Sequence, residues 1–369
     1  MISLAARPSS HADYELSPSK VLTSMGSIFY SPFISRGTVV NLDAFFGSRN
    51  RQPNAWAILQ DLGVNIIDVR GGGCEGDLGW EINAHPNTWA SSLDSFLSQA
   101  DSHGIKVMFS WMGTYWHNLF GVECPEPYIG FAGTTVAQAK LLVDKLAGNN
   151  NLNHNFFTDS RILAWSPANE VDLADSVTRD WVLQILDYMK SKGATVFLSC
   201  PRNTAYPSNP NDWMGSISFQ ATEPLIRGHV DFLDYHDYRL YEVVLAKNNG
   251  QDIYTVTYNL FKQDLQNSVL NAKGSMPLDH IILGEFGIWH GYDNGAGIAL
   301  PANFTEQERG AYYRAVYQVC ADLGIRNVFN FLCFAEIEGD GSYQRRYEVI
   351  DAGGVYFAEC TSVMQQYYK

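Results

Sequence analysis

Eight short apolar, β-rich runs recur along the chain, with amphipathic stretches between them. The runs are nearly continuous in apolar residues, whereas a strand exposed on one face would alternate apolar and polar positions. Continuous runs are typical of a parallel sheet that is covered on both faces. The predicted strands span residues 26–33, 64–70, 106–111, 162–168, 195–200, 231–238, 281–286 and 327–334.

Helix patterns follow most of these strands. The clearest cover residues 92–104, 178–193 and 305–324, and each ends at a glycine suited to close a helix. Thr305 and Glu308 have the spacing of a capping box, and the tail 355–369 would be the eighth helix. The stretch 201–230 is rich in Pro, Asn and Ser and shows no clear long helix.

Alternating strands and helices predict the α/β class, and eight such units favour a (β/α)₈ TIM barrel over an open doubly wound sheet. No composition break or fixed-period repeat indicates a second domain. We therefore expect one barrel domain over residues 1–369. It would carry long loops at its C-terminal face and an N-terminal extension over residues 1–22.

The net charge limits the kinds of partner that the protein is expected to bind. Lys and Arg total 25 against 39 Asp and Glu, a net charge of −14. Nucleic acid and anionic membrane both require a basic surface, so neither is expected as a partner. There is no run of 18 apolar residues, so no transmembrane helix is expected. The apolar stretch in the first ten residues, MISLAARPSS, is too short for a signal peptide. The compartment stays open between secretion, if a leader precedes this stretch, and the cytoplasm. The oligomeric state is equally open.

The six cysteines show no CxxC pair and no zinc-type spacing, so no metal site is expected. Cys200, Cys320 and Cys333 lie in apolar segments and are predicted to be inert core residues. Cys74 and Cys124 fall in loop-like stretches, and the sequence does not decide whether they form a disulfide.

Candidate chemistry lies at the ends of two strands. "ILAWSPANE" ends in Asn169-Glu170, and "IILGEFG" carries Glu285. In a barrel, catalytic groups belong at the C-terminal ends of strands. Two carboxyl groups across the barrel mouth are the machinery of glycoside cleavage, in which one protonates the leaving oxygen and the other attacks the anomeric carbon or activates water. Glu170 and Glu285 are therefore the catalytic candidates.

These motifs resemble clan A of the retaining glycoside hydrolases, most nearly the family 5 cellulases and mannanases, over residues 24–340. The resemblance implies that Glu170 is the acid/base and that Glu285, within Gly284-Glu285-Phe286-Gly287, is the nucleophile. Two further matches are Arg70, at the end of the second strand, and His236-Asp237-Tyr238, on the sixth.

The resemblance also implies supporting roles. Arg70 and Tyr238 would hold the nucleophile ionised and aimed, because a positive charge and a donated hydrogen bond both favour a carboxylate. Asn169 would bind the 2-hydroxyl of the sugar, and His236 would lie near the acid/base or contact the sugar. The chain departs from family 5 at Val171, where Pro is usual, and on strand eight, where Phe331 and Phe334 replace a Trp. On strand three, Trp111 or His117 would substitute for a His.

Aromatic residues crowd the predicted loops at the active face, and sugar rings stack on such side chains. We predict sugar subsites among Trp80, Trp111, Tyr115, Trp116, Trp213, Trp289 and Tyr292. Glu336 would bind sugar hydroxyls or lie in a solvated loop beside Arg345 and Arg346. Trp56, Trp165 and Trp181 are predicted to pack against helices or the core.

Each candidate also has a purely structural interpretation. Asn169-Glu170 could cap a helix, Glu285 and Arg70 could form ion pairs, and His236 and Tyr238 could be packing residues. Gly71, Gly73 and Gly76 have dinucleotide-fingerprint spacing, but no helix pattern opens directly after them, so no cofactor is expected.

The predicted activity is retaining hydrolysis of β-glycosidic bonds in a β-linked poly- or oligosaccharide, with β-1,4-glucan or mannan favoured. The two carboxyl groups would lie about 5–5.5 Å apart. The alternatives are a non-catalytic carbohydrate-binding barrel and a transglycosylase on the same scaffold.

Overall fold

A computed structural model gives the structure of the protein. Besides a few isolated positions, it describes residues 31–41, 54–70, 85–110, 135–169, 176–201, 224–271, 273–288, 304–331 and 354–369.

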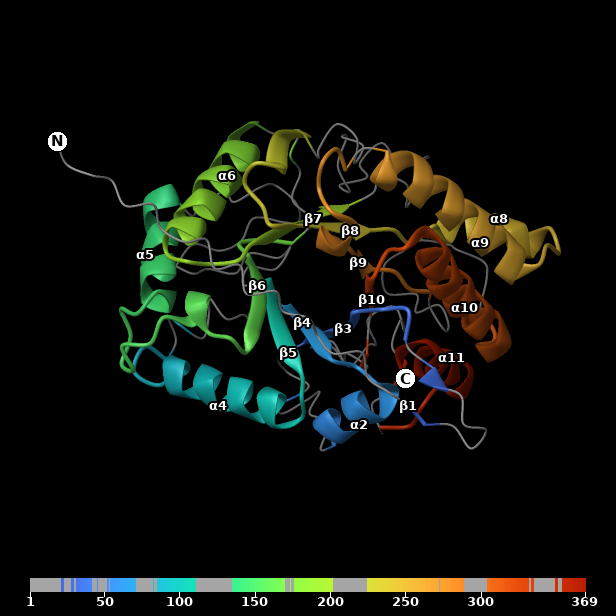
Figure 1. Ribbon diagram of the computed structural model, residues 1–369, viewed down its shortest axis with the longest axis horizontal. Helices are drawn as coiled ribbons and strands as arrows, with labels where there is room; N and C mark the ends of the chain where they lie inside the picture. The colour runs from blue at the N-terminus through green and yellow to red at the C-terminus, as the bar shows by residue number, and fades with distance from the viewer. Residues whose placement is uncertain are drawn as a thin grey trace.

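Eight parallel strands form a nearly closed barrel in the order β6-β5-β4-β3-β10-β9-β8-β7 (Figure 1). The gap between β6 and β7 is spanned by a parallel bridge from Trp165 to Val196, and the Trp165 amide donates to the Thr195 carbonyl at 2.9 Å. The predicted barrel is thus confirmed. The strands are β3 (Ser35–Asn41), β4 (Ile66–Arg70), β5 (Lys106–Ser110), β6 (Ile162–Ser166), β7 (Phe197–Pro201), β8 (Phe232–His236), β9 (Ile281–Glu285) and β10 (Asn327–Asn330).

Helices form a ring outside the strands (Figure 1). Thr305 and Glu308 make both bonds of the predicted capping box, and Gly324 ends the following helix in the left-handed conformation. Between β7 and β8 the described residues 224–230 hold only one short helical turn. The helices are α2 (Ala55–Leu62), α4 (Trp89–Ser102), α5 (Val136–Leu146), α6 (Ser176–Ser191), α8 (Leu240–Asn248), α9 (Ile253–Asp264), α10 (Glu306–Leu323) and α11 (Ala358–Tyr368).

The predicted first strand, 26–33, was wrong. The first barrel strand is β3, whereas Ile28–Phe29 forms β2, an antiparallel pair with β1 (Val21–Leu22) outside the barrel. Polar residues in "SRGTVVN" hide β3 from a search for apolar runs. Gly37 within it is required by packing, because a Cβ there would lie 1.7 Å from the Phe329 ring, which fills the barrel interior.

The barrel interior changes from apolar to polar toward the C-terminal ends of the strands. Side chains two residues apart on a strand point to the same face, so each inward apolar residue is followed by a second inward position. The apolar layer contains Ile66, Met108, Ala164, Phe197, Ile282 and Phe329. The layer above it contains Asp68, Ser110, Ser166, Ser199 and Asp234, all buried. Polar chemistry is therefore concentrated at the C-terminal mouth.

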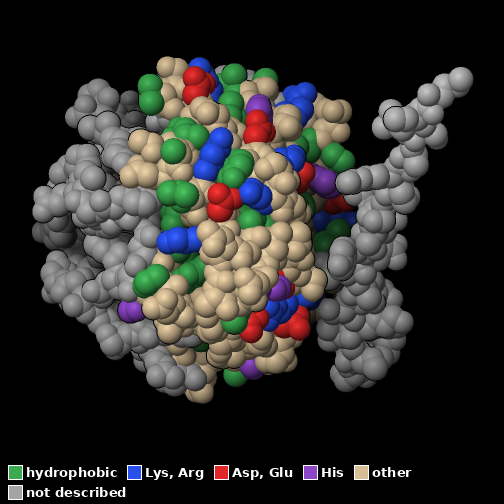
Figure 2. All heavy atoms as spheres, turned by 90° about the vertical axis from the view of Figure 1, so that its left-hand side faces the viewer, with side chains coloured by type: hydrophobic (Ala, Val, Ile, Leu, Met, Phe, Trp, Pro, Cys, Tyr) green, Lys and Arg blue, Asp and Glu red, His purple; other side chains and the backbone are tan. Residues whose placement is uncertain are grey.

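The face formed by α4, α5 and α6 is mixed in charge (Figure 2). Acidic, basic and apolar side chains alternate over it. Within the described part of the chain, no helix is both long and apolar enough to cross a membrane.

Candidate functional site

Glu285, the last residue of β9, is the centre of the described site. It is only 4% exposed, and its Oε2 atom accepts a hydrogen bond from the Tyr238 hydroxyl. The Nδ1 atom of His236 lies 3.5 Å from the same oxygen. Three residues singled out from the sequence thus meet at one carboxylate oxygen.

Strand pairing brings these residues together. β8 and β9 are parallel neighbours, and a register shift between Tyr235 and His236 aligns His236 with Glu285. The backbone N–H of Asp237 donates to the Glu285 carbonyl at 3.0 Å, which extends the pairing past the end of β8. The backbone of Tyr238 is held in place by Tyr312, whose hydroxyl donates to the Tyr238 carbonyl at 2.7 Å.

His236 has a second carboxylate partner that the sequence analysis missed. Its Nε2 atom lies 3.1 Å from Oδ2 of Asp234, and both side chains are essentially inaccessible to solvent. A Cβ on Gly284 would lie 1.7 Å from Asp234 Oδ1, so that glycine leaves the space which the carboxylate fills. The available signal was a charged residue inside the apolar run "FLDYH", since a buried charge requires a partner.

The segment after β8 is fixed by a buried arginine. Arg239 adopts a left-handed backbone conformation with φ of 50°, which is uncommon for a residue with a Cβ. Its guanidinium contacts three carboxylates: Asp237 at 3.2 Å, Glu242 at 2.9 Å and Asp264 at 2.8 Å. This network orients the residues on both sides of Tyr238.

Asp264 joins this network to the outer helices. Its other carboxylate oxygen accepts from the Tyr235 hydroxyl, and Tyr235 is a residue of β8 itself. At Asp264 the α9 helix gives way to a π-helical segment, η2 (Leu265–Leu270). π-Helical turns are frequently found at functional sites, so this irregularity fits its position behind the mouth.

Asn169 lies three residues beyond the end of β6 and is 8% exposed. Its amide oxygen accepts from the Ser199 hydroxyl at 3.0 Å. The Ser166 hydroxyl donates to the Ala168 carbonyl at 2.6 Å and shapes the turn between them. With the amide oxygen engaged, the Asn169 NH₂ group is the end that can donate to a ligand.

Other predicted residues fall outside the described part of the chain. Arg70 is placed by its backbone at the end of β4, but its side chain is not described. The Glu170–Glu285 separation therefore stays a prediction, as does the pairing of Cys74 with Cys124. The undescribed residues are Glu170, Trp111, Trp116, Trp289 and Glu336, together with Trp80, Tyr115, His117, Val171, Trp213 and Tyr292.

Several packing predictions are confirmed. Trp165 and Trp181 are buried, and Trp56 packs partly buried against the same core. The two aromatic residues after β10 differ. Phe331 meets Tyr238 edge to face, with ring centroids 6.1 Å apart, whereas Phe334 is buried in the core.

The described cysteines are unreactive. Cys320, Cys333 and Cys360 are free and buried, and burial raises the pKa of each thiol, for Cys360 to about 12. A thiol held protonated in this way is a poor nucleophile. In the described ranges, no group of three or more His, Cys, Asp or Glu could hold a metal ion.

No protein-family model matches the chain, and no curated protein does. Solved structures share its fold at low sequence identity. The hyperthermostable endo-1,4-β-D-mannanase from Thermotoga petrophila RKU-1 is 16% identical with a TM-score of 0.57, and the match covers 91% of this chain and 99% of that one. The endo-1,4-β-mannanase from Rhizomucor miehei is 17% identical with a TM-score of 0.59, covering 93% and 96%.

A β-D-glucuronidase from Dictyoglomus thermophilum is 13% identical with a TM-score of 0.59, and the match covers 95% of this chain but only 54% of that one. At these identities the similarity shows the fold alone. The chain therefore has the same (β/α)₈ fold as solved endo-mannanases and β-glucuronidases.

Proposed function

We propose that the protein is a retaining glycoside hydrolase that cleaves β-glycosidic bonds in a β-linked polysaccharide or oligosaccharide. The observation that carries this proposal is the buried Glu285 carboxylate at the end of β9, with Tyr238 and His236 both directed at its Oε2 atom. A buried carboxylate held by donors at the mouth of a barrel has the burial and orientation that a nucleophile needs.

Glu285 would attack the anomeric carbon through one oxygen while Tyr238 holds the other. The C–O bond to the leaving group would break as Glu170 donates its proton to that oxygen, which leaves a glycosyl ester on Glu285. Glu170 would then take a proton from water. That water would attack the same carbon and release the sugar and the Glu285 carboxylate, with net retention.

Asn169 would donate from its NH₂ group to the 2-hydroxyl of the sugar. In support, its amide oxygen accepts from the Ser199 hydroxyl, which leaves the NH₂ group as a donor for a ligand. A hydrogen bond at this hydroxyl strengthens in the transition state, so it would contribute to rate as well as to binding.

A β-1,4-glucan or mannan is the favoured substrate class. Supporting it, the mannanases that share the fold are nearly coextensive with this chain, whereas the glucuronidase is about twice as long as the part it shares. The whole chain, residues 1–369, would then be one catalytic barrel preceded by an extension over residues 1–22.

The test compares the native protein with Glu285→Ala on β-glucans, mannans, xylan and aryl β-glycosides. Glu359→Ala, on the outer helix α11, is the matched control. Sugar release by the native protein and the control, abolished in Glu285→Ala, would support the proposal. Equal release by all three would contradict it. Oligosaccharide binding without release would favour a carbohydrate-binding barrel, and longer products at high acceptor concentration would favour a transglycosylase.

A further inference from the structure

The imidazole of His236 lies between two buried carboxylates. Nε2 is 3.1 Å from Asp234 Oδ2, and Nδ1 is 3.5 Å from Glu285 Oε2. The exposed fractions of the three residues are 1% for Asp234 and His236 and 4% for Glu285. Both ring nitrogens therefore face a carboxylate oxygen, with little water to compensate for a poor match.

This arrangement restricts where the protons can be. A neutral imidazole has one N–H donor and one nitrogen lone pair, whereas an imidazolium donates from both nitrogens. A lone pair facing an ionised carboxylate would be unfavourable in a buried site. His236 is therefore either an imidazolium between two carboxylates, or a neutral ring that accepts a hydrogen bond from Glu285 or Asp234, whichever of the two is protonated.

The nucleophilic role excludes a protonated Glu285, because only an ionised Glu285 can attack the anomeric carbon. Two arrangements then remain: an imidazolium between two carboxylates, and a neutral ring that accepts from a protonated Asp234. We infer that Asp234 is a positioning residue whose carboxylate keeps His236 as an imidazolium, so that its Nδ1–H is directed at Glu285 and holds that carboxylate ionised. This inference rests on the proposed function and adds to it a residue that acts through His236.

The composition of the polar layer supports this role. On β5, β6 and β7, the buried residue two positions after the apolar layer is a serine: Ser110, Ser166 and Ser199. β8 instead has Asp234 at this position, and the next inward residue on that strand is the basic His236. β4 shows the same pattern, with Asp68 followed two residues later by Arg70. Acid and base thus recur together on the two strands.

Several titratable groups can influence the protonation of His236. Asp234 on β8 and Glu285 on β9 face its two ring nitrogens. Tyr238, after β8, donates to the same Glu285 oxygen. Asp68 on β4 belongs to the same layer. Glu170, which the proposed function assigns to this mouth, lies outside the described residues, and so does the side chain of Arg70 at the end of β4. Because all of these can influence an activity profile, the primary readout is the protonation of His236 itself.

That protonation is measurable by NMR of protein labelled with ¹⁵N-histidine. The chain has nine histidines, and the His236 signals are those lost in His236→Gln. We expect both ring nitrogens of His236 to carry protons at neutral pH in the native protein. In Asp234→Asn, we expect the midpoint for loss of the second proton to fall by at least about one pH unit, a tenfold change in the equilibrium. A neutral His236 in the native protein, or the same midpoint in both proteins, would overturn the inference.

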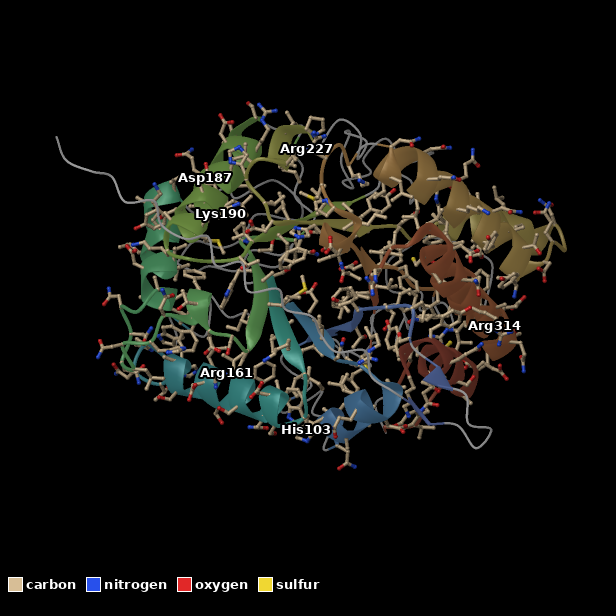
Figure 3. All side chains as sticks on the ribbon, in the orientation of Figure 1. His103, Arg161, Asp187, Lys190, Arg227 and Arg314 are labelled. Atoms are coloured by element: carbon tan, nitrogen blue, oxygen red, sulfur yellow. The ribbon has the colours of Figure 1, made fainter. Side chains whose placement is uncertain are left out.

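Activity provides the second readout. In Asp234→Asn the acidic limb of the kcat/KM profile should move to higher pH, whereas the basic limb, set by the acid/base, should stay in place. Asp187→Asn is the control, because it removes a similar aspartate–histidine pair, Asp187 with His229 at 2.7 Å, from the exposed surface of α6 (Figure 3). Its profile should match the native one. An unmoved acidic limb in Asp234→Asn would contradict the inference.

Asp234→Ser is the second variant if the Asn variant does not fold, since serine occupies the corresponding position, two residues after the apolar layer, on three other strands. The two proposals can fail separately. If Glu285→Ala keeps full activity, the proposed function fails, and the NMR titration still reports on Asp234. If Glu285 is essential while His236 titrates identically with and without Asp234, only the present inference fails.

Discussion

Each end of the barrel carries a cluster of acidic side chains and a histidine, but the two clusters differ in how the carboxylates are paired. Just before β6, at the N-terminal end, Arg161 lies 2.6 Å from both Asp94 and Asp159, and His154 is 2.8 Å from Asp159. Arg161 projects beside α4 (Figure 3). At the C-terminal ends of β8 and β9, two carboxylates share one imidazole.

The N-terminal cluster is electrostatically satisfied. Burial alone would raise the pKa of Asp159, but hydrogen bonds from the Arg161 side chain and backbone and from His154 outweigh it and lower the pKa to about 2. A carboxylate held this firmly in its charged form contributes to folding and has little reactivity. The C-terminal cluster instead leaves a buried carboxylate beside a tyrosine and a histidine, facing the mouth. The comparison assigns stability to one end and chemistry to the other.

The largest effect is expected at the C-terminal end. Glu285→Gln keeps the size of the side chain but removes the proposed nucleophile, so kcat should fall by a factor on the order of 10⁴ to 10⁶. The free energy of unfolding should stay the same or rise, because an ionised group leaves the core. Steady-state kinetics and urea unfolding measure the two. A loss of stability without a loss of kcat would reverse the assignment of the two ends.

The apolar layer should show the opposite behaviour. Phe329→Ala removes a buried ring that packs over Gly37 and should cost about 3–5 kcal/mol in the free energy of unfolding. Activity per folded molecule, measured at low temperature, should stay close to native. A large fall in kcat with unchanged stability would mean that this layer also shapes the site.

Tyr238→Phe sharpens the comparison within the site. A hydrogen bond to a charged group is worth about 1.5–3 kcal/mol, so kcat should fall by about 10- to 150-fold. Tyr258→Phe is the control, because it removes a tyrosine–carboxylate bond of 2.6 Å to Asp322 at the surface. Equal effects of the two substitutions on kcat would show that the Tyr238 hydroxyl has no special role.

Asp159→Asn tests the N-terminal cluster through pH. The folded-state pKa of about 2 lies below the unfolded value, so the stabilisation is present above the unfolded pKa and is lost as pH falls toward the folded one. The variant should be about 2 kcal/mol less stable than the native protein at neutral pH, and the difference should shrink below about pH 4. Urea unfolding at both pH values measures this. A pH-independent difference would contradict the ion-pair account.

The smallest effect is expected on the outer ring. Thr305→Ala removes the N-cap hydrogen bond to Glu308 and should cost about 1 kcal/mol of stability with no change in kcat. Thermal unfolding detects a change of this size. A change in kcat would show that α10 is coupled to the mouth.

Local signals in the sequence predicted most of the framework. Helix ends at Thr305 and Gly324 depend on contacts within a few residues, and the chain supplies the required side chains there. β3 was not predicted because its core contact is non-local. A glycine is needed at position 37 because of the Phe329 ring, which comes nearly 300 positions later in the chain. A search for apolar runs has no access to that relation.

The candidate site also combines residues that the sequence predicted with residues that it did not. The family resemblance predicted that Tyr238 holds Glu285, whereas it placed His236 near the acid/base or the sugar. His236 lies beside Glu285 because β8 and β9 are parallel neighbours that end at one edge. Asp234 was missed since it was read as part of an apolar run. The Arg239 network was missed because its partner Asp264 comes from the far end of another helix. The Arg239–Asp264 contact leaves no trace in residue spacing.

The most direct test of the central claim is the configuration of the first-formed product, followed by ¹H NMR on the substrate that the panel identifies. The account predicts that the β-anomer appears first and then mutarotates, because Glu285 attacks the anomeric carbon opposite the leaving group and water then displaces Glu285 from the face that the leaving group occupied. A product that appears first as the α-anomer would contradict the nucleophilic role of Glu285. It would instead require a single displacement by water.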